Sequence, residues 1–80
     1  MNKVQMAAEL YNMRDRAKRL CGDNYFDRMA QLGSELQDIA KKSNKGLLET
    51  AIDLAKERYY AGLDLMMLMA AVVELTEPSK

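Results

Sequence analysis

Apolar residues recur at helical spacing in the first quarter of the chain. The first stripe of such residues, with steps of four, three, four and three, comprises Met6, Leu10, Met13, Ala17 and Leu20. This spacing keeps the side chains on one side of an α-helix. Gly22 and Asn24 then interrupt the pattern, because glycine favours the end of one helix and asparagine the start of the next. The pattern predicts a first helix over residues 3–21.

A second stripe with the same steps follows the interruption. Its members are Tyr25, Met29, Leu32, Leu36 and Ile39. Lys41 and Lys42 come near its end, where cations interact favourably with the exposed carbonyl groups of a helix C-terminus. The second predicted helix therefore spans residues 25–41.

A third stripe continues in alternating steps of four and three through most of the remaining chain. It comprises Leu48, Ile52, Ala55, Tyr59, Gly62, Met66, Ala70 and Val73. The stripe predicts one helix over residues 46–75, bent at Gly62, because glycine inside a helix costs about 1 kcal/mol relative to alanine. A break at Gly62, giving four helices in all, is the structural alternative.

The three stripes predict an all-α fold, a small antiparallel three-helix bundle that forms a single domain over residues 1–80. The composition agrees, because 49% of the residues are apolar and the 80 residues include only one proline and four glycines. A chain of this length buries a modest core, so association with another chain would add stability.

The last predicted helix is apolar on nearly every side. From Leu63 to Leu75 only Asp64 and Glu74 are polar, and two shorter helices are not expected to cover such a surface. We therefore expect a self-association or partner interface, with a dimer favoured, formed by Tyr60, Leu63, Met66, Met67, Leu68, Met69, Ala70 and Val73. On this interpretation Met67→Asp should dissolve the oligomer without loss of helix, whereas Ile52→Asp should unfold the protein.

The formal net charge is zero, but the two ends of the chain differ in sign. Residues 1–20 hold five Lys or Arg against two Asp or Glu, and residues 47–80 hold six Asp or Glu against three Lys or Arg. The basic cluster can form ion pairs with the acidic end, or it can bind nucleic acid or a nucleotide-like anion. The residues for that second use are Tyr11, Arg14, Arg16, Lys18, Arg19, Lys41, Lys42 and Lys45.

The chain offers little equipment for catalysis. Histidine is absent, Cys21 is the only cysteine, and the isolated glycines form no phosphate-binding loop. We therefore expect no enzymatic activity, no catalytic or metal-binding residues and no cofactor. The lone cysteine, the missing secretory pattern and the short apolar run predict a cytoplasmic protein without a membrane span.

These observations predict a non-enzymatic protein–protein interaction module that acts as a homo-oligomer. Small chains of this type are common among phage and mobile-element products, so an inhibitor or adaptor that binds a host protein is the leading hypothesis. The alternative is a binder of nucleic acid or of a small anionic ligand through the basic first helix.

Overall fold

The structure is a computed structural model that describes residues 2–76. Over that range the chain forms no β-strand; its α-helices are α1 (Lys3–Cys21), α2 (Tyr25–Ser43), α3 (Leu47–Glu57) and α4 (Gly62–Thr76). A short 3-10 turn, η1 (Gly22–Asn24), joins α1 to α2. The predicted all-α helical bundle is confirmed, and the first two helices begin at the residues expected from the stripes.

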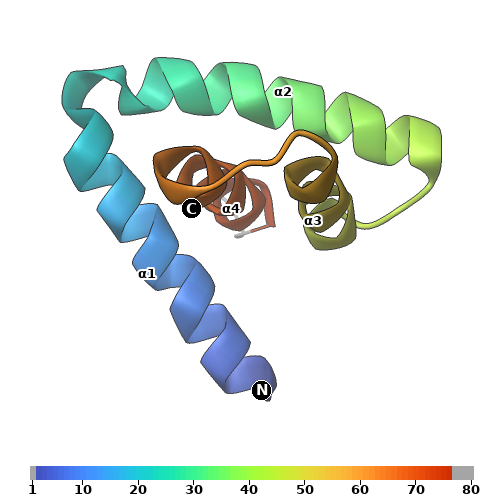
Figure 1. The fold of residues 1–80 in the computed structure, drawn as a ribbon, viewed down its shortest axis with the longest axis horizontal. Helices are drawn as coiled ribbons and strands as arrows, with labels where there is room; N and C mark the ends of the chain where they lie inside the picture. The colour runs from blue at the N-terminus through green and yellow to red at the C-terminus, as the bar shows by residue number, and fades with distance from the viewer. Residues whose placement is uncertain (1, 77–80) are drawn as a thin grey trace.

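The helices are arranged around α4. Figure 1 shows α1 and α2 meeting at an open angle at η1, with α4 lying between them and packed against both. Residues 58–61 connect α3 to α4, and the two helices form an antiparallel hairpin that is seen nearly end-on beneath α2. Helices α1, α2 and α3 therefore surround α4. This arrangement differs from a three-helix bundle whose helices run up, down and up.

The continuous helix over residues 46–75 does not form, and the alternative with four helices is correct. The break begins before Gly62, because α3 ends at Glu57. Tyr59 and Gly62 have φ angles of 57° and 56°, in the left-handed region, where a right-handed helix cannot continue. A straight helix of that length would extend about 45 Å, whereas the longest dimension of the fold is 32 Å.

The core is centred on the second half of α4. Every residue from Met67 to Val73 is buried, because α1, α2 and α3 each cover part of the α4 surface. Five residues predicted to contact a partner are therefore buried within a single chain: Met67, Leu68, Met69, Ala70 and Val73. The expectation that two helices would leave this run uncovered was wrong, because the break supplies a third covering helix. Tyr60, Leu63 and Met66 are half-buried, and their contact with a partner stays a prediction.

The break also changes which side of α3 is buried. Ala51 and Leu54 face the core together with Thr50, whose hydroxyl donates to the carbonyl of Gly46 at 2.8 Å. Ile52 is 42% exposed and Tyr59 is 90% exposed, although both belong to the predicted core stripe. The predicted stripe required one continuous helix. Because the chain instead turns back between α3 and α4, the stripe no longer describes which α3 residues face the core.

Candidate functional site

A cluster of polar side chains links α1 and α2 to the C-terminal end of α4 through a hydrogen bond and ion pairs. The Tyr25 hydroxyl donates to Glu74 Oε1 at 3.3 Å, and Arg14 Nη1 and Lys18 Nζ each lie 3.9 Å from the same oxygen. Tyr25 is 1% exposed. Burial, with the Glu74 carboxylate as a further cause, raises the pKa of the Tyr25 hydroxyl above its ordinary value. Arg14 and Lys18 thus take part in the intramolecular ion pairing expected between the basic and acidic ends.

The other residues predicted to bind an anion do not come together in one site within a single chain. Arg16 and Arg19 are exposed on α1, where they line an open hollow with Asn12, Asp15 and Lys18. The side chain of Tyr11 lies under the Arg14 guanidinium, 4.8 Å from ring centroid to Cζ. Figure 1 shows the C-terminal end of α2, which carries Lys41 and Lys42, on the opposite side of the molecule from α1. Lys45, just beyond that end, pairs with Asp53 at 2.8 Å.

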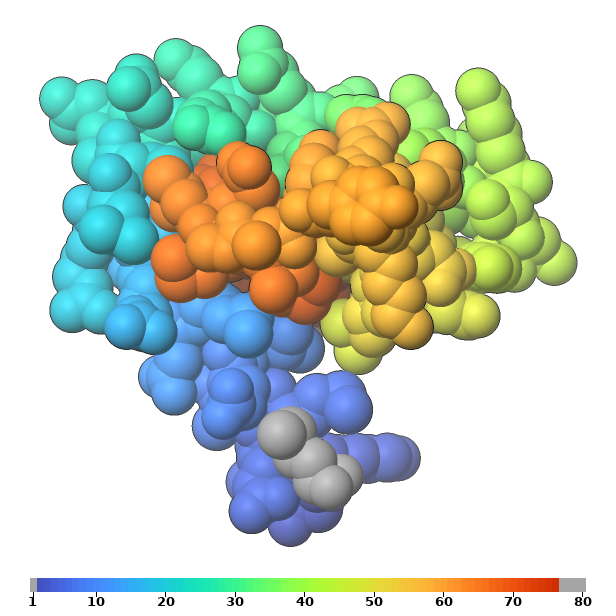
Figure 2. Space-filling view, viewed as in Figure 1, coloured from blue at the N-terminus to red at the C-terminus, as the bar shows by residue number. Residues whose placement is uncertain are grey.

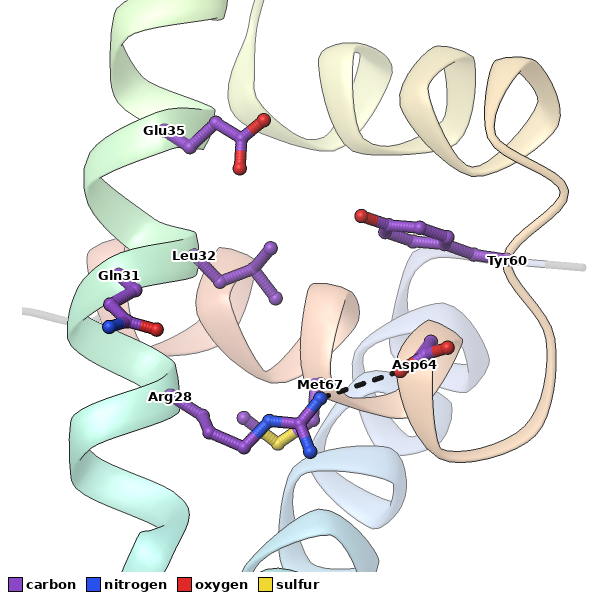
Figure 3. Close-up of a pocket in the computed structure, with 7 residues that line it drawn as sticks. All are labelled: Arg28, Gln31, Leu32, Glu35, Tyr60, Asp64 and Met67. Atoms are coloured by element: carbon purple, nitrogen blue, oxygen red, sulfur yellow. Dashed lines mark ion pairs between the residues drawn. The ribbon is translucent and has the colours of Figure 1, made fainter.

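A small polar pocket lies between α2 and the start of α4. It encloses about 160 Å³ and is lined by Arg28, Gln31, Leu32, Glu35, Tyr60, Asp64 and Met67. Figure 3 shows Arg28 reaching across the pocket to Asp64, and the two side chains form an ion pair at 3.5 Å. On the other side Arg58 Nη2 lies 2.6 Å from Glu35 Oε1, and its Nη1 donates to the Tyr60 hydroxyl at 3.4 Å.

The size and the pairing of its charges argue against this pocket as a ligand site. Pockets for small organic ligands usually exceed about 300 Å³. Arg28 and Glu35 on α2 are each paired across the gap, with Asp64 and Arg58 respectively. We interpret these ion pairs as contacts that join α2 to the α3–α4 hairpin.

A larger and more apolar depression lies on the outer side of the same hairpin. We call it the apolar hollow; it measures about 320 Å³ and is lined by Ile52, Ala55, Lys56, Tyr59, Tyr60, Leu65 and Met69. Lys56 is the one charged residue among the described residues that line it. Tyr60 and Met69 belong to the interface predicted from the sequence. Sequence reasoning missed Ile52 and Tyr59 as surface residues because their spacing placed them in the core stripe.

Tyr59 occupies an unusual backbone position at the rim of the apolar hollow. Helices α2 and α3 end alike: Lys45 N–H donates to the Ala40 carbonyl at 3.1 Å, and Tyr60 N–H donates to the Ala55 carbonyl at 2.9 Å. Each bond belongs to a Schellman motif, whose left-handed residue is usually Gly or Asn. Asn44 fills that position after α2, but Tyr59 fills it after α3. A bulky residue with positive φ is uncommon, and such strain tends to cluster at binding sites.

The described residues contain neither a cluster of metal-ligating side chains nor a membrane-spanning helix. Within residues 2–76 no group of three or more His, Cys, Asp or Glu side chains could hold a metal ion. Over the same range, none of the helices is long and apolar enough to cross a membrane.

No protein-family model, curated protein or solved structure matches the chain at a significant level.

Proposed function

We propose that the protein is a non-enzymatic protein-binding module whose docking surface is the apolar hollow. The observation that supports this proposal best is Tyr59, which is 90% exposed while its backbone is in the left-handed region. Glycine or asparagine would fit that position with less strain. An exposed tyrosine held there is explained if its ring contributes to binding, since tyrosine is enriched among the residues that dominate interface energies.

The chemistry of the apolar hollow favours an amphipathic helix as its occupant. Aliphatic and aromatic side chains from α3, the connection and α4 surround the depression, and Lys56 lies at its side. A partner helix with an apolar ridge fits such a groove, and a carboxylate on its flank would pair with Lys56. In this proposal the protein acts as an inhibitor or adaptor of the protein that carries the helix.

The test is co-purification of the tagged protein from the cells that make it, followed by native mass spectrometry. Tyr59→Gly and Ile52→Asp should each remove the partner, because the first deletes the exposed ring and the second places a charge in the apolar hollow. Phe26→Asp is the matched control, since Phe26 is an exposed apolar residue on α2 outside the apolar hollow. A partner that survives both hollow substitutions would contradict the proposal.

The mass of the purified complex also shows whether the apolar hollow is occupied by a second copy of the chain. A homodimer that Tyr59→Gly converts to monomer would assign the apolar hollow to self-association, and the proposed hetero-partner would then be wrong. Such a result would agree with the predicted dimer, because Tyr60 and Met69 line the apolar hollow.

Binding of nucleic acid or a nucleotide is the alternative function. Its support is the exposed pair Arg16 and Arg19 on α1. Its weakness is that Arg14 and Lys18 are drawn toward Glu74. The alternative requires salt-dependent retention on a polyanion resin that is lost when Arg16 and Arg19 are both changed to serine.

A further inference from the structure

The side of α1 that faces solvent carries a second ordered series of residues. Its members, in steps of four, three and four, are Val4, Ala8, Tyr11 and Asp15. At 100° per residue this series lies on the opposite side of the helix from Leu10, Met13 and Ala17, which pack into the core. Val4 is 78% exposed. We call this side, together with the neighbouring Arg16 and Arg19, the α1 outer face.

The first turns of α1 extend away from the rest of the molecule. Residues 2–9 are all exposed, and Figures 1 and 2 show this end of α1 projecting below the other helices. A capping box begins the helix: Asn2 Oδ1 accepts from Gln5 N–H at 2.8 Å, and Gln5 Oε1 accepts from Asn2 N–H at 3.2 Å. This helix end is thus formed although its residues 2–9 are exposed among the described residues, whereas short helices in water usually need packing to persist.

The α1 outer face changes character along its length. Its first half is apolar and small, because Ala7 and Ala8 lie beside Val4 and the only charged residues among positions 2–12 are Lys3 and Glu9. Its second half is basic, because Arg16 and Arg19 are exposed and line an open hollow with Asp15, whereas Lys18 in the same hollow already pairs with Glu74. A ligand complementary to both halves is apolar at one end and acidic at the other.

We propose that the α1 outer face docks an acidic amphipathic helix of a partner protein, separately from the apolar hollow. The partner's apolar residues pack on Val4, Ala8 and Tyr11, and its carboxylates lie over Arg16 and Arg19. The alanines permit close approach of the two helix axes, which are about 8–10 Å apart in ordinary packing. The basic hollow is displaced around α1 from the apolar turns, so the partner helix crosses α1 obliquely.

The apolar half of the α1 outer face favours protein over nucleic acid as its ligand. Phosphate groups would engage the cations but would leave Val4 and Ala8 in water, because the nucleic-acid backbone offers them no apolar surface. The α1 outer face and the apolar hollow belong to different helices on different sides of the molecule. With both surfaces occupied, the protein connects two partners, as an adaptor does.

The experiment measures fluorescence anisotropy of a labelled helical peptide titrated with the full-length protein. The probe has about 18 residues, leucines at steps of four and three in its first half and glutamates on the same side of its second half. A matched peptide carries glutamine in place of every glutamate, and a DNA duplex of similar charge serves as the nucleic-acid probe. Binding of the acidic peptide on the order of 10 μM, weakening as salt rises, is the expected result.

Variants separate the two halves of the α1 outer face. Arg16→Ser with Arg19→Ser should weaken binding of the acidic peptide about tenfold, because two charge contacts are lost. Val4→Ser should weaken it about threefold, because an exposed valine no longer gains burial. Lys41→Ser with Lys42→Ser, which removes two exposed cations at the far end of α2, should leave the affinity unchanged. Far-UV circular dichroism checks that each variant keeps its helices.

Three outcomes would overturn the proposal. Equal affinity for the acidic and glutamine peptides would show that the cations make no contribution. Equal affinity for the duplex and the acidic peptide, with no effect of Val4→Ser, would show that the α1 outer face selects negative charge alone. Absence of peptide binding at millimolar protein would show that the face docks no such helix. None of these outcomes bears on the apolar hollow, whose test uses different variants.

Discussion

Helix α4 and the connection that precedes it are both rich in apolar residues, yet they end in opposite environments. Residues 67–73 of α4 are all buried, whereas Tyr59 in the connection and Ile52 on the outer side of α3 remain exposed. The difference arises because α3 turns back at the connection and covers a side of α4 that α1 and α2 leave open. Because α4 is apolar on nearly every side, its surface has to be covered. The turn at residues 58–61 allows α3 of the same chain to provide part of that cover.

Substitution by aspartate should show this contrast at its largest. Met67 is 1% exposed, so Met67→Asp places an uncompensated carboxylate in the core and should destabilise the protein by about 4 kcal/mol or more. Ile52→Asp should cost about 1 kcal/mol or less, because the side chain reaches water. This ordering is the reverse of the one expected from the stripes.

Thermal unfolding followed by circular dichroism measures both effects. The wild type and Ile52→Asp should melt cooperatively, whereas Met67→Asp should show little folded baseline. If Met67→Asp kept a cooperative melt and altered only the oligomeric state, the interface interpretation of α4 would be restored.

The sequence predicted local helical structure well and long-range packing less well. The stripes located α1 and α2 because each is covered mainly along one side, which gives a clear period. The end of α3 was missed because Tyr59 continues the stripe in phase, and no Gly, Asn or Pro stands there to indicate a helix end. Ile52 and Tyr59 were consequently assigned to the core, so part of the apolar hollow was hidden from sequence reasoning.

The contrast extends to Tyr25, which is buried against the end of α4. Because the pKa of its hydroxyl is raised in the folded state, the folded protein keeps this proton at a pH at which the unfolded chain loses it. Stability from this group is complete below the unfolded pKa, about 10, and falls as the pH rises beyond it. One pH unit above that value the loss should be about 1.4 kcal/mol.

Urea unfolding at neutral pH and at alkaline pH tests this linkage when wild type and Tyr25→Phe are compared. At neutral pH the variant should be less stable by about 1 kcal/mol, because it lacks the hydrogen bond to Glu74. At alkaline pH the variant should lose less stability than the wild type, since it has no hydroxyl to ionise at this position. Parallel losses in the two proteins would show that Tyr25 is not protected from ionisation.

The smallest expected effect concerns Tyr59, the exposed residue in the connection between α3 and α4. Tyr59→Gly should stabilise the protein by about 0.5–1 kcal/mol, because glycine adopts the left-handed conformation without strain and an exposed ring contributes little packing. Asn44→Gly is the matched control at the end of α2, where asparagine already tolerates positive φ, and its effect should be within about 0.3 kcal/mol.

A rise in melting temperature for Tyr59→Gly, together with loss of the co-purifying partner, would separate stability from binding at one residue. The connection would then be a segment that gives up stability in order to present a side chain, whereas α4 supplies the stability that permits it. A fall in melting temperature would instead mean that the Tyr59 ring stabilises the α3–α4 hairpin. In that case the strain would have a structural explanation, and the apolar hollow would lose its strongest support as a docking surface.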